Sequence, residues 1–130
     1  MELALTQCPC GTGQDLQTCC GPILGGHPAP TAVALMRSRY TAFALGDVAY
    51  LGRSWHSSTA PADLDIDPDQ IWTRLRILDT ARGQETDTTG TVTFRAHYKV
   101  GTERGALSET SRFVRQDGHW FYLDGDVAQD

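Results

Sequence analysis

Residues 91–100 read Thr-Val-Thr-Phe-Arg-Ala-His-Tyr-Lys-Val, and this stretch decides the fold class. Apolar side chains occupy every second position, which is the period of a β-strand with one face in the core and the other in water. These positions are Val92, Phe94, Ala96, Tyr98 and Val100. We therefore predict a strand that is buried on one face only.

Turn signals follow this strand and predict that the chain continues in antiparallel fashion. Residues 101–105 contain two glycines and predict a hairpin turn into a strand over residues 107–115. Asp117-Gly118 is a two-residue turn signal, after which residues 119–124 are expected to form the last strand. The second part of the chain thus predicts three consecutive antiparallel strands.

The residues before this meander predict a further strand. Leu75 and Ile77 share one side of an alternating stretch that begins after Trp72. The polar residues 83–90 then form a turn into the strand at residues 91–100. We expect a sheet of four or more antiparallel strands in chain order.

The chain ahead of the sheet has a helical period. Thr31 can cap a helix that Gly46 ends, and a second short helix is expected over residues 47–55. The apolar stripe of the first helix consists of Val33, Met36, Tyr40, Phe43 and Ala44. Asp67-Pro68 predicts the start of a third short helix, with proline at its first position. Three helices packed on an antiparallel sheet define an α+β fold with a pocket at its open end.

Length and charge limit the classes of function. The 130 residues suit one domain with a small appendage, and a hydrophobic content of 40% suffices for a modest core. A formal net charge of -5 argues against a general nucleic-acid binder. No apolar run approaches membrane-spanning length, so we expect no membrane partner. Residues 1–5 offer no apolar secretory core, and we therefore expect a cytoplasmic protein.

All the cysteines lie in the first twenty residues, as Cys8, Cys10, Cys19 and Cys20. Four sulfurs joined by a short glycine-rich loop suit a tetrahedral soft-metal site, most often zinc. Iron or an empty site remains an alternative. A disulfide framework is disfavoured, because no secretory signal precedes the cysteines and adjacent cysteines rarely bridge each other.

The run Cys8-Pro9-Cys10-Gly11-Thr12-Gly13, closed by Cys19-Cys20-Gly21, resembles the SEC-C zinc motif. This motif is named after the C-terminal tail of the translocation ATPase SecA. The resemblance implies that all four cysteines are zinc ligands. Known SEC-C motifs carry a basic stretch before the second cysteine pair, whereas residues 14–18 here contain no lysine or arginine. Recognition of a partner through positive charge at this place is therefore not implied.

Further segments along nearly the whole chain resemble the YchJ family of small bacterial proteins. They are residues 35–43 (Leu-Met-Arg-Ser-Arg-Tyr-Thr-Ala-Phe), 47–51 (Asp-Val-Ala-Tyr-Leu), 55–58 (Trp-His-Ser-Ser), 109–113 (Glu-Thr-Ser-Arg-Phe) and 118–125 (Gly-His-Trp-Phe-Tyr-Leu-Asp-Gly). The resemblance implies a cone-shaped domain similar to nuclear transport factor 2 and ketosteroid isomerase. It implies no settled activity.

The glycines and prolines of residues 21–30 predict a linker between two parts of the chain. We therefore expect a SEC-C-like zinc knob at residues 1–26 and a nuclear transport factor 2-like cone at residues 27–130. The knob has few apolar residues, so its fold should depend on the metal, whereas the cone should fold without the knob.

Glu109 is the most informative candidate for a pocket, because the alternation of its strand turns it toward the apolar side. A carboxylate there needs a partner, such as Arg37 or Arg39, or a hydrogen bond from Tyr122 or Trp120. A structural buried pair is the simpler interpretation, and a general acid or base is the functional one. The candidate pocket residues are Arg37, Arg39, Tyr40, Trp55, His56, Glu109, Tyr122 and Asp124.

Two function classes remain open on these residues. One is a binding or adaptor module, with a zinc knob for a protein partner and a cone for a small molecule. The other is an enzyme that performs acid-base chemistry in the cone, for example an isomerase or a hydrolase. The residues favour the binding module, because Glu109 has no clear second titratable group. Four cysteines leave no open metal position for catalysis. The protein is expected to be a monomer or a homodimer.

Overall fold

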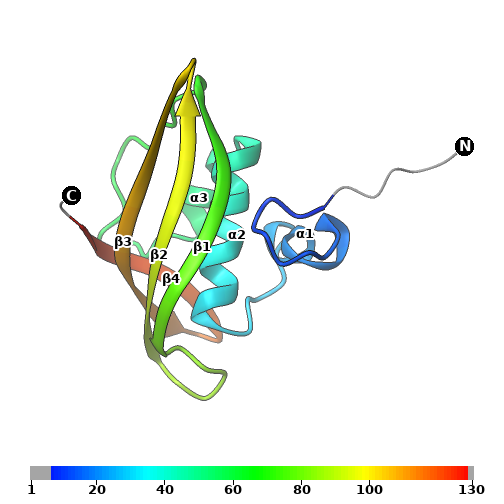
Figure 1. The fold of residues 1–130 in the computed structure, drawn as a ribbon. Coiled ribbons are helices and arrows are strands. Elements are labelled where there is room, and N and C mark those ends of the chain that lie inside the picture. Colours follow the sequence, from blue (N-terminus) through cyan, green and yellow to red (C-terminus); the bar gives the residue numbers. More distant parts are fainter. Residues whose placement is uncertain (1–6, 129–130) are drawn as a thin grey trace, which may run out of the picture.

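The computed structural model describes residues 7–128 (Figure 1). Two short helices begin this part of the chain, two longer helices follow, and four strands complete it. The elements are η1 (Leu16–Thr18), α1 (Cys20–Leu24), α2 (Ala32–Leu45), α3 (Val48–Arg53), β1 (Gln70–Arg82), β2 (Thr89–Val100), β3 (Glu103–Gln116) and β4 (His119–Val127). The predicted α+β fold is confirmed.

The strands form one antiparallel sheet in the order β1-β2-β3-β4, as the turn signals predict. Register shifts interrupt β1 between Trp72 and Arg74 and between Ile77 and Asp79, and another follows Arg112 in β3. Such bulges bend and twist a sheet. The bent sheet curves around α2, which packs against β1, β2 and β4 (Figure 1).

Local sequence signals place α2 and α3 where they were predicted. The Thr31 hydroxyl accepts a hydrogen bond from the Ala34 backbone nitrogen at 3.1 Å, which satisfies one free donor of the first turn of α2. Gly46 ends α2 with a φ of 79°, a conformation that costs glycine little. Asp47 then caps α3 by accepting from the Tyr50 backbone nitrogen at 3.0 Å.

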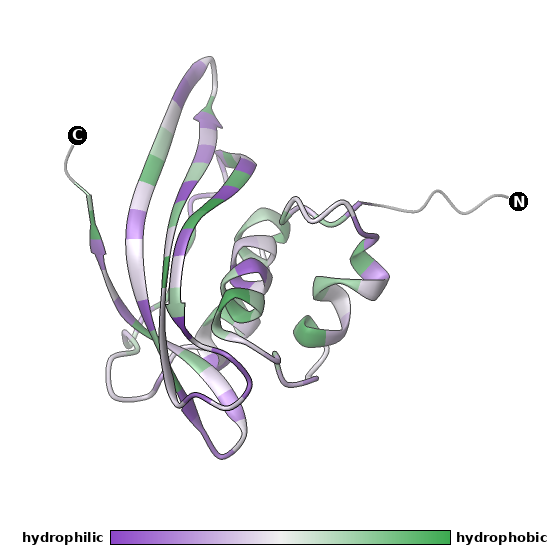
Figure 2. Ribbon diagram, turned by 60° about the horizontal axis from the view of Figure 1, so that its bottom comes forward, coloured by the Kyte–Doolittle hydropathy of each residue, from purple (hydrophilic) through white to green (hydrophobic). Residues whose placement is uncertain are grey.

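The core lies between α2 and the inner face of the sheet. Val92, Phe94 and Ala96 of β2 are buried there, and Phe113 and Trp120 join them from β3 and β4. Bands of opposite hydropathy alternate along the strands, as Figure 2 shows. The period-two pattern of residues 91–100 is therefore the one that builds the core.

The third helix is not where the sequence predicts it. Asp67 and Pro68 form a turn, in which the Asp67 carboxylate accepts from the Asp69 backbone nitrogen at 2.9 Å. The Asp67 carbonyl accepts from Gln70, where β1 begins at once. A side chain that bonds its own backbone two residues ahead favours a turn over a helix.

A third helix does occur, but it is α1, inside the predicted linker. It begins at Cys20 and has Pro22 in its first turn, where proline costs no hydrogen bond. The segment with η1 and α1 lies beside α2, and α2 separates it from most of the sheet (Figures 1 and 2). Within residues 7–128, no helix is long and apolar enough to cross a membrane.

Candidate metal centre and cone cavity

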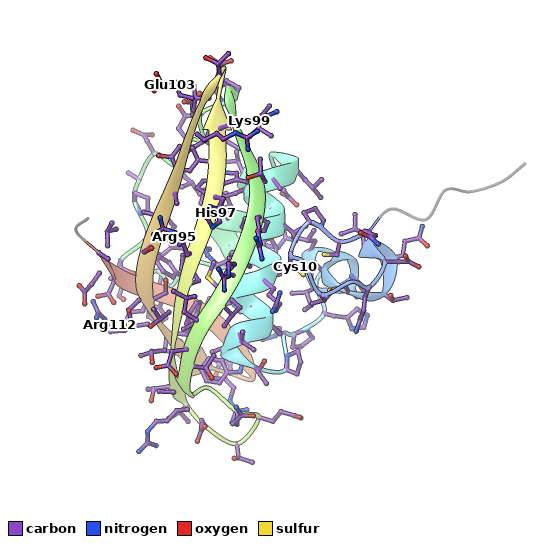
Figure 3. The ribbon with its side chains drawn as sticks, in the orientation of Figure 1. Cys10, Arg95, His97, Lys99, Glu103 and Arg112 are labelled. Atoms are coloured by element: carbon purple, nitrogen blue, oxygen red, sulfur yellow. The ribbon has the colours of Figure 1, made fainter. Side chains whose placement is uncertain are left out.

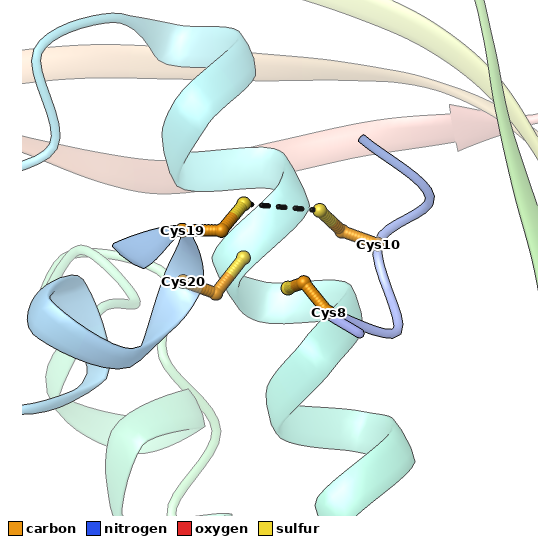
Figure 4. Close-up of side chains that lie close together, drawn as sticks. All are labelled: Cys8, Cys10, Cys19 and Cys20. Carbon is orange, nitrogen blue, oxygen red and sulfur yellow. Dashed lines mark hydrogen bonds between the residues drawn. The ribbon is translucent and has the colours of Figure 1, made fainter. Parts of the chain in front are cut away.

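The four cysteines converge on one point beside α2 (Figure 4). Their sulfurs all lie within 4.8 Å of one another, and the cysteines are free of disulfides. The Sγ atoms of Cys10 and Cys19 are 3.6 Å apart. Four sulfurs bound tetrahedrally to zinc at about 2.3 Å are themselves about 3.8 Å apart. The cluster can therefore bind a metal ion with little rearrangement.

The local sequence brings the two cysteine pairs together. Gly11 and Gly13 both have a φ of 87°, which lets the chain reverse directly after Cys10. The Cys8 backbone nitrogen donates to the Gln14 carbonyl at 2.8 Å and closes this loop. The other pair stands at the start of α1, with Cys20 as its first residue.

The charges in the cluster favour a cation. A hydrogen bond from Cys20 lowers the pKa of the Cys10 thiol to about 4. The same bond raises the pKa of the Cys20 thiol, and burial raises that of Cys19. One thiolate is thus stable here, but additional negative charge is not. A divalent metal ion removes this limit, because it deprotonates the thiols that bind it.

The cysteine cluster is attached to the cone through α2. The Cys8 Sγ atom lies 3.5 Å from the Thr41 hydroxyl. Arg37 Nη1 donates to the Cys10 carbonyl at 2.7 Å, so Arg37 belongs to this contact and not to the pocket for which it was a candidate. Helical spacing explains the difference, since Arg37 and Arg39 project from different sides of α2. Cys8, Cys10 and Cys20 are buried in the same apolar cluster as the inner face of the sheet.

A cavity of about 260 Å³ lies between α2 and the inner face of the sheet. Six of its lining residues are aromatic, and the others are three apolar and three polar or charged residues. The lining consists of Met36, Arg39, Tyr40, Phe43, Trp55, Trp72, Phe94, Ala96, Leu107, Glu109, Ser111 and Tyr122. Five candidates predicted from the sequence are thus brought together, namely Arg39, Tyr40, Trp55, Glu109 and Tyr122.

Glu109 supplies the carboxylate of the cavity. Its Oε2 atom accepts hydrogen bonds from the Ser111 hydroxyl at 2.7 Å and the Tyr122 hydroxyl at 3.0 Å. Gly125 lies so close that a Cβ atom at that position would collide with the carboxylate. Burial, followed by the charge of Glu109, raises the pKa of Tyr122, so this phenol stays protonated and donates.

Arg39 is the buried cation beside this group, with 4% of its surface exposed. Its Nη1 atom donates to the Leu51 carbonyl at 2.9 Å and the Ser54 hydroxyl at 2.6 Å. Its guanidinium carbon lies 4.6 Å from the Tyr122 ring centroid and 5.2 Å from that of Trp55. Burial lowers the pKa of Arg39 to about 10, so it remains charged at neutral pH.

The partner of Glu109 therefore differs from the arginine that was expected first. Within residues 7–128, the ion pairs closer than 4 Å are those of Arg112 with Asp124 and Asp126. Glu109 uses hydroxyl donors instead, one of them the predicted Tyr122. Arg39 is stabilised by acceptors and aromatic rings.

His56 and Asp124 are candidates that do not line the cavity. His56 Nε2 lies 2.8 Å from Gln116 Oε1, and its Nδ1 lies 2.8 Å from the Ser58 hydroxyl. Trp55 forms a bridge with β4 and faces the cavity, so the next residue turns away from it. Asp124 binds Arg112 at 2.5 Å, opposite it in the β3–β4 ladder. The register shift between Arg112 and Phe113 leaves Leu123 without a partner in this ladder, so Asp124 lies on the outer face with Arg112 although Tyr122 faces the cavity.

Most of the cavity wall was not predicted from the sequence. Phe94, Leu107 and Ser111 could have been found, because they share the alternation that places Glu109 on the inner face. Trp72 is harder to predict, because the register shifts directly after it.

This geometry defines the class of the protein as a helix-covered antiparallel cone with an N-terminal cysteine-cluster knob. The chain belongs to the YchJ family, because residues 31–125 match the family model described as "YchJ, middle NTF2-like domain". Residues 6–22 match the model of the SEC-C motif. The resemblances found in the sequence are thereby confirmed.

Relatives cover nearly the full chain. The UPF0225 protein SCO1677 of Streptomyces coelicolor is 57% identical over 120 residues, 92% of this chain and 94% of the relative. A UPF0225 protein of Chromobacterium violaceum is 48% identical and covers 96% of both chains.

Two solved structures share the fold. RPA3114, a SEC-C motif containing protein from Rhodopseudomonas palustris, has a TM-score of 0.83 and 30% identity, covering 95% of this chain and 100% of its own. A SEC-C motif containing protein from Psychrobacter arcticus has a TM-score of 0.76 and 26% identity, covering 95% and 83%.

Proposed function

We propose that Cys8, Cys10, Cys19 and Cys20 bind one zinc ion that serves structure rather than catalysis. The convergence of four sulfurs within 4.8 Å is the observation that carries this proposal. A set of four thiolates fills a tetrahedron and leaves no position for a reacting water. A reducing cytoplasm keeps such thiols available to the metal, so we place the protein there.

We further propose that the cone binds a small, mainly apolar molecule that carries a hydrogen-bond donor. The aromatic lining supplies the apolar contact, and Glu109 supplies an acceptor. Both hydrogen bonds to Glu109 end on Oε2, and among the described residues none donates to Oε1. A ligand hydroxyl or amine pointing at Oε1 complements the cavity.

A binding role suits the cavity better than acid-base catalysis. Catalysis of that kind uses two titratable groups near the substrate. Of the described lining residues, Glu109 is the one with a carboxyl group, and His56 lies outside the cavity. Burial raises the pKa of Tyr40 to about 12, which keeps it protonated at neutral pH.

We propose that the chain consists of a knob at residues 1–26 and a cone at residues 27–130, and that the knob contacts a protein partner. Gln14, Gln17 and Thr18 of the loop between the cysteine pairs are exposed and uncharged. Asp15 carries the one charge of this loop, so a metal-held loop of this kind offers a rigid and mainly uncharged polar surface. The cone then provides a separate ligand site in the same chain.

Phenol is a suitable probe for the cavity, because it combines a ring with one hydroxyl donor. We expect titration with phenol to shift the indole N–H signals of Trp55 and Trp72 in NMR spectra, while Trp120 outside the cavity serves as a reference. Glu109→Ala should weaken phenol binding by roughly tenfold or more, since it removes the acceptor. Glu109→Gln keeps one acceptor and should bind phenol with an intermediate affinity.

Stability measurements separate ligand binding from folding. Glu109→Ala leaves the Tyr122 and Ser111 hydroxyls without their acceptor and should cost about 1–3 kcal/mol of unfolding free energy. Glu103→Ala, at the tip of the β2–β3 hairpin, is the control and should change neither stability nor binding. Unchanged indole signals at millimolar phenol would remove the support for a ligand site.

A further inference from the structure

A concentration of positive charge occupies the outer face of the sheet, away from the cavity. Three adjacent rows of the β1-β2-β3 ladder carry five of the chain's eleven lysines and arginines, together with one histidine. We call these residues the outer basic patch: Arg74, Arg76, Arg95, His97, Lys99 and Arg104. Figure 3 shows Arg95, His97 and Lys99 following one another along β2.

The register places these side chains on one surface. Arg76 pairs with Arg95, Arg74 with His97, and Lys99 with Arg104. The residues that alternate with them along β1 and β2 include Leu75, Phe94 and Ala96, which are buried against the inner face. Arg74, Arg76 and Arg104 are exposed, and the other three are half-buried.

The outer basic patch has no carboxylate partner in the part of the chain that the structure describes, where the ion pairs are those of Arg112. Arg95 donates to the Ser108 hydroxyl at 2.8 Å, a neutral group. Glu103 stands at the hairpin tip and alternates to the other face, and Asp79 belongs to the next row.

Like charges directly opposite each other destabilise a sheet. Arg76 opposite Arg95 and Lys99 opposite Arg104 are two such pairs within three rows. Side chains that work against their own fold suggest a role outside it. An anionic partner would convert this repulsion into attraction.

We propose that the outer basic patch docks an extended acidic segment of a partner protein. Alternate residues of an extended chain recur every ~6.6–6.8 Å, and so do the basic side chains along β1 and β2. Carboxylates on alternate residues of the partner therefore meet successive basic side chains. Arginine forks bind carboxylates in a two-bond geometry, which adds specificity.

The same surface suits nucleic acid poorly. Proteins that bind single strands combine positive charge with aromatic side chains on which bases stack. The three rows contain no aromatic ring besides His97, because Trp72 and Tyr98 alternate to the inner face. The net charge of -5 also repels a long polyanion, whereas a short acidic segment meets mainly the local charge.

The probe is a blocked ten-residue peptide with aspartate at alternate positions, and the same peptide with asparagine is its control. We expect the aspartate peptide to bind the full-length protein in low salt and to weaken steeply as salt is added. Arg76→Glu should reduce this affinity by roughly tenfold or more. Its fold should be kept, since the new carboxylate lies opposite Arg95.

Arg82→Glu makes the same change of charge at the other end of β1 and should leave peptide binding nearly unchanged. Binding that is equally lost in both variants would reflect net charge alone and overturn the proposal. If a ten-nucleotide thymidine strand binds more tightly than the peptide, the partner is nucleic acid and the proposal of an acidic segment is wrong. Absence of peptide binding in low salt would also overturn the proposal, as would salt-sensitive self-association that depends on Arg76.

Discussion

Cys20→Ser should release the metal ion and lower the stability of the whole protein. Cys20 is 1% exposed and lies in the same apolar cluster as the inner face of the sheet. The substitution removes a thiolate from the proposed site and buries a hydroxyl in its place. We expect a loss of about 3 kcal/mol or more in unfolding free energy, measured by thermal or urea denaturation.

Thr12→Ala is the matched control for the cysteine variant. The Thr12 hydroxyl contacts the Cys19 sulfur at 3.2 Å, so its removal disturbs the cluster but leaves all four sulfurs in place. This variant should keep its metal and lose about 1 kcal/mol at most. Equal losses in the two variants would show that the metal contributes little.

Removal of the metal ion with a chelator tests the same site without a mutation. We expect residues up to about 26 to lose structure, whereas the sheet keeps its far-UV circular dichroism at 25 °C. The ladders join residues 70–127 among themselves and need no contact from the knob. The melting temperature should still fall, because Arg37 and Thr41 of α2 lose their contacts with Cys10 and Cys8. Global unfolding on chelation would contradict the division at residue 26.

Arg39→Ala should have the other large effect on stability. The change removes the hydrogen bonds to the Leu51 carbonyl and the Ser54 hydroxyl and empties space beside the Trp55 and Tyr122 rings. Unsatisfied buried acceptors and a new void together should cost about 3–5 kcal/mol. Urea denaturation of the purified variant measures this cost.

Two further variants define the role of the Arg39 guanidinium. Arg39→Lys keeps the charge but lacks the planar fork that stacks on the rings, so it should recover only part of the loss. Arg82→Ala, at an exposed position in β1, should change stability by less than about 0.5 kcal/mol. If Arg39→Lys is as stable as the parent protein, the stacking and fork geometry contribute nothing measurable.

The sheet was predictable because its signals are local. Alternation over residues 91–100 and the Asp117-Gly118 turn depend on a few neighbouring residues each, and both are confirmed. The inner position of Glu109 followed from the same alternation. The failure at Asp67-Pro68 has a simple cause, since an Asp side chain that accepts from backbone two residues ahead can begin either a turn or a helix, and here β1 begins directly after it at Gln70.

Features that depend on contacts between distant residues could not be predicted from the sequence pattern. Helix α1 lies among glycines and prolines, and its first residue is held by a sulfur cluster whose other members come from residues 8–19. The choice between hydroxyl and arginine partners for Glu109 depends on how β3, β4 and α2 meet. Alternation alone would have placed Asp124 on the same face as Tyr122, and the register shift that turns Asp124 outward depends on how β3 pairs with β4.

The metal content of the protein, purified under reducing conditions, examines the central claim most directly. Elemental analysis combined with thiol alkylation of the folded protein reports both the metal and the state of its ligands. The four clustered cysteines predict one zinc per chain and four thiols that react only after chelation or unfolding. Metal-free folded protein with four freely reacting thiols would contradict the account, as would a disulfide between any two of these cysteines.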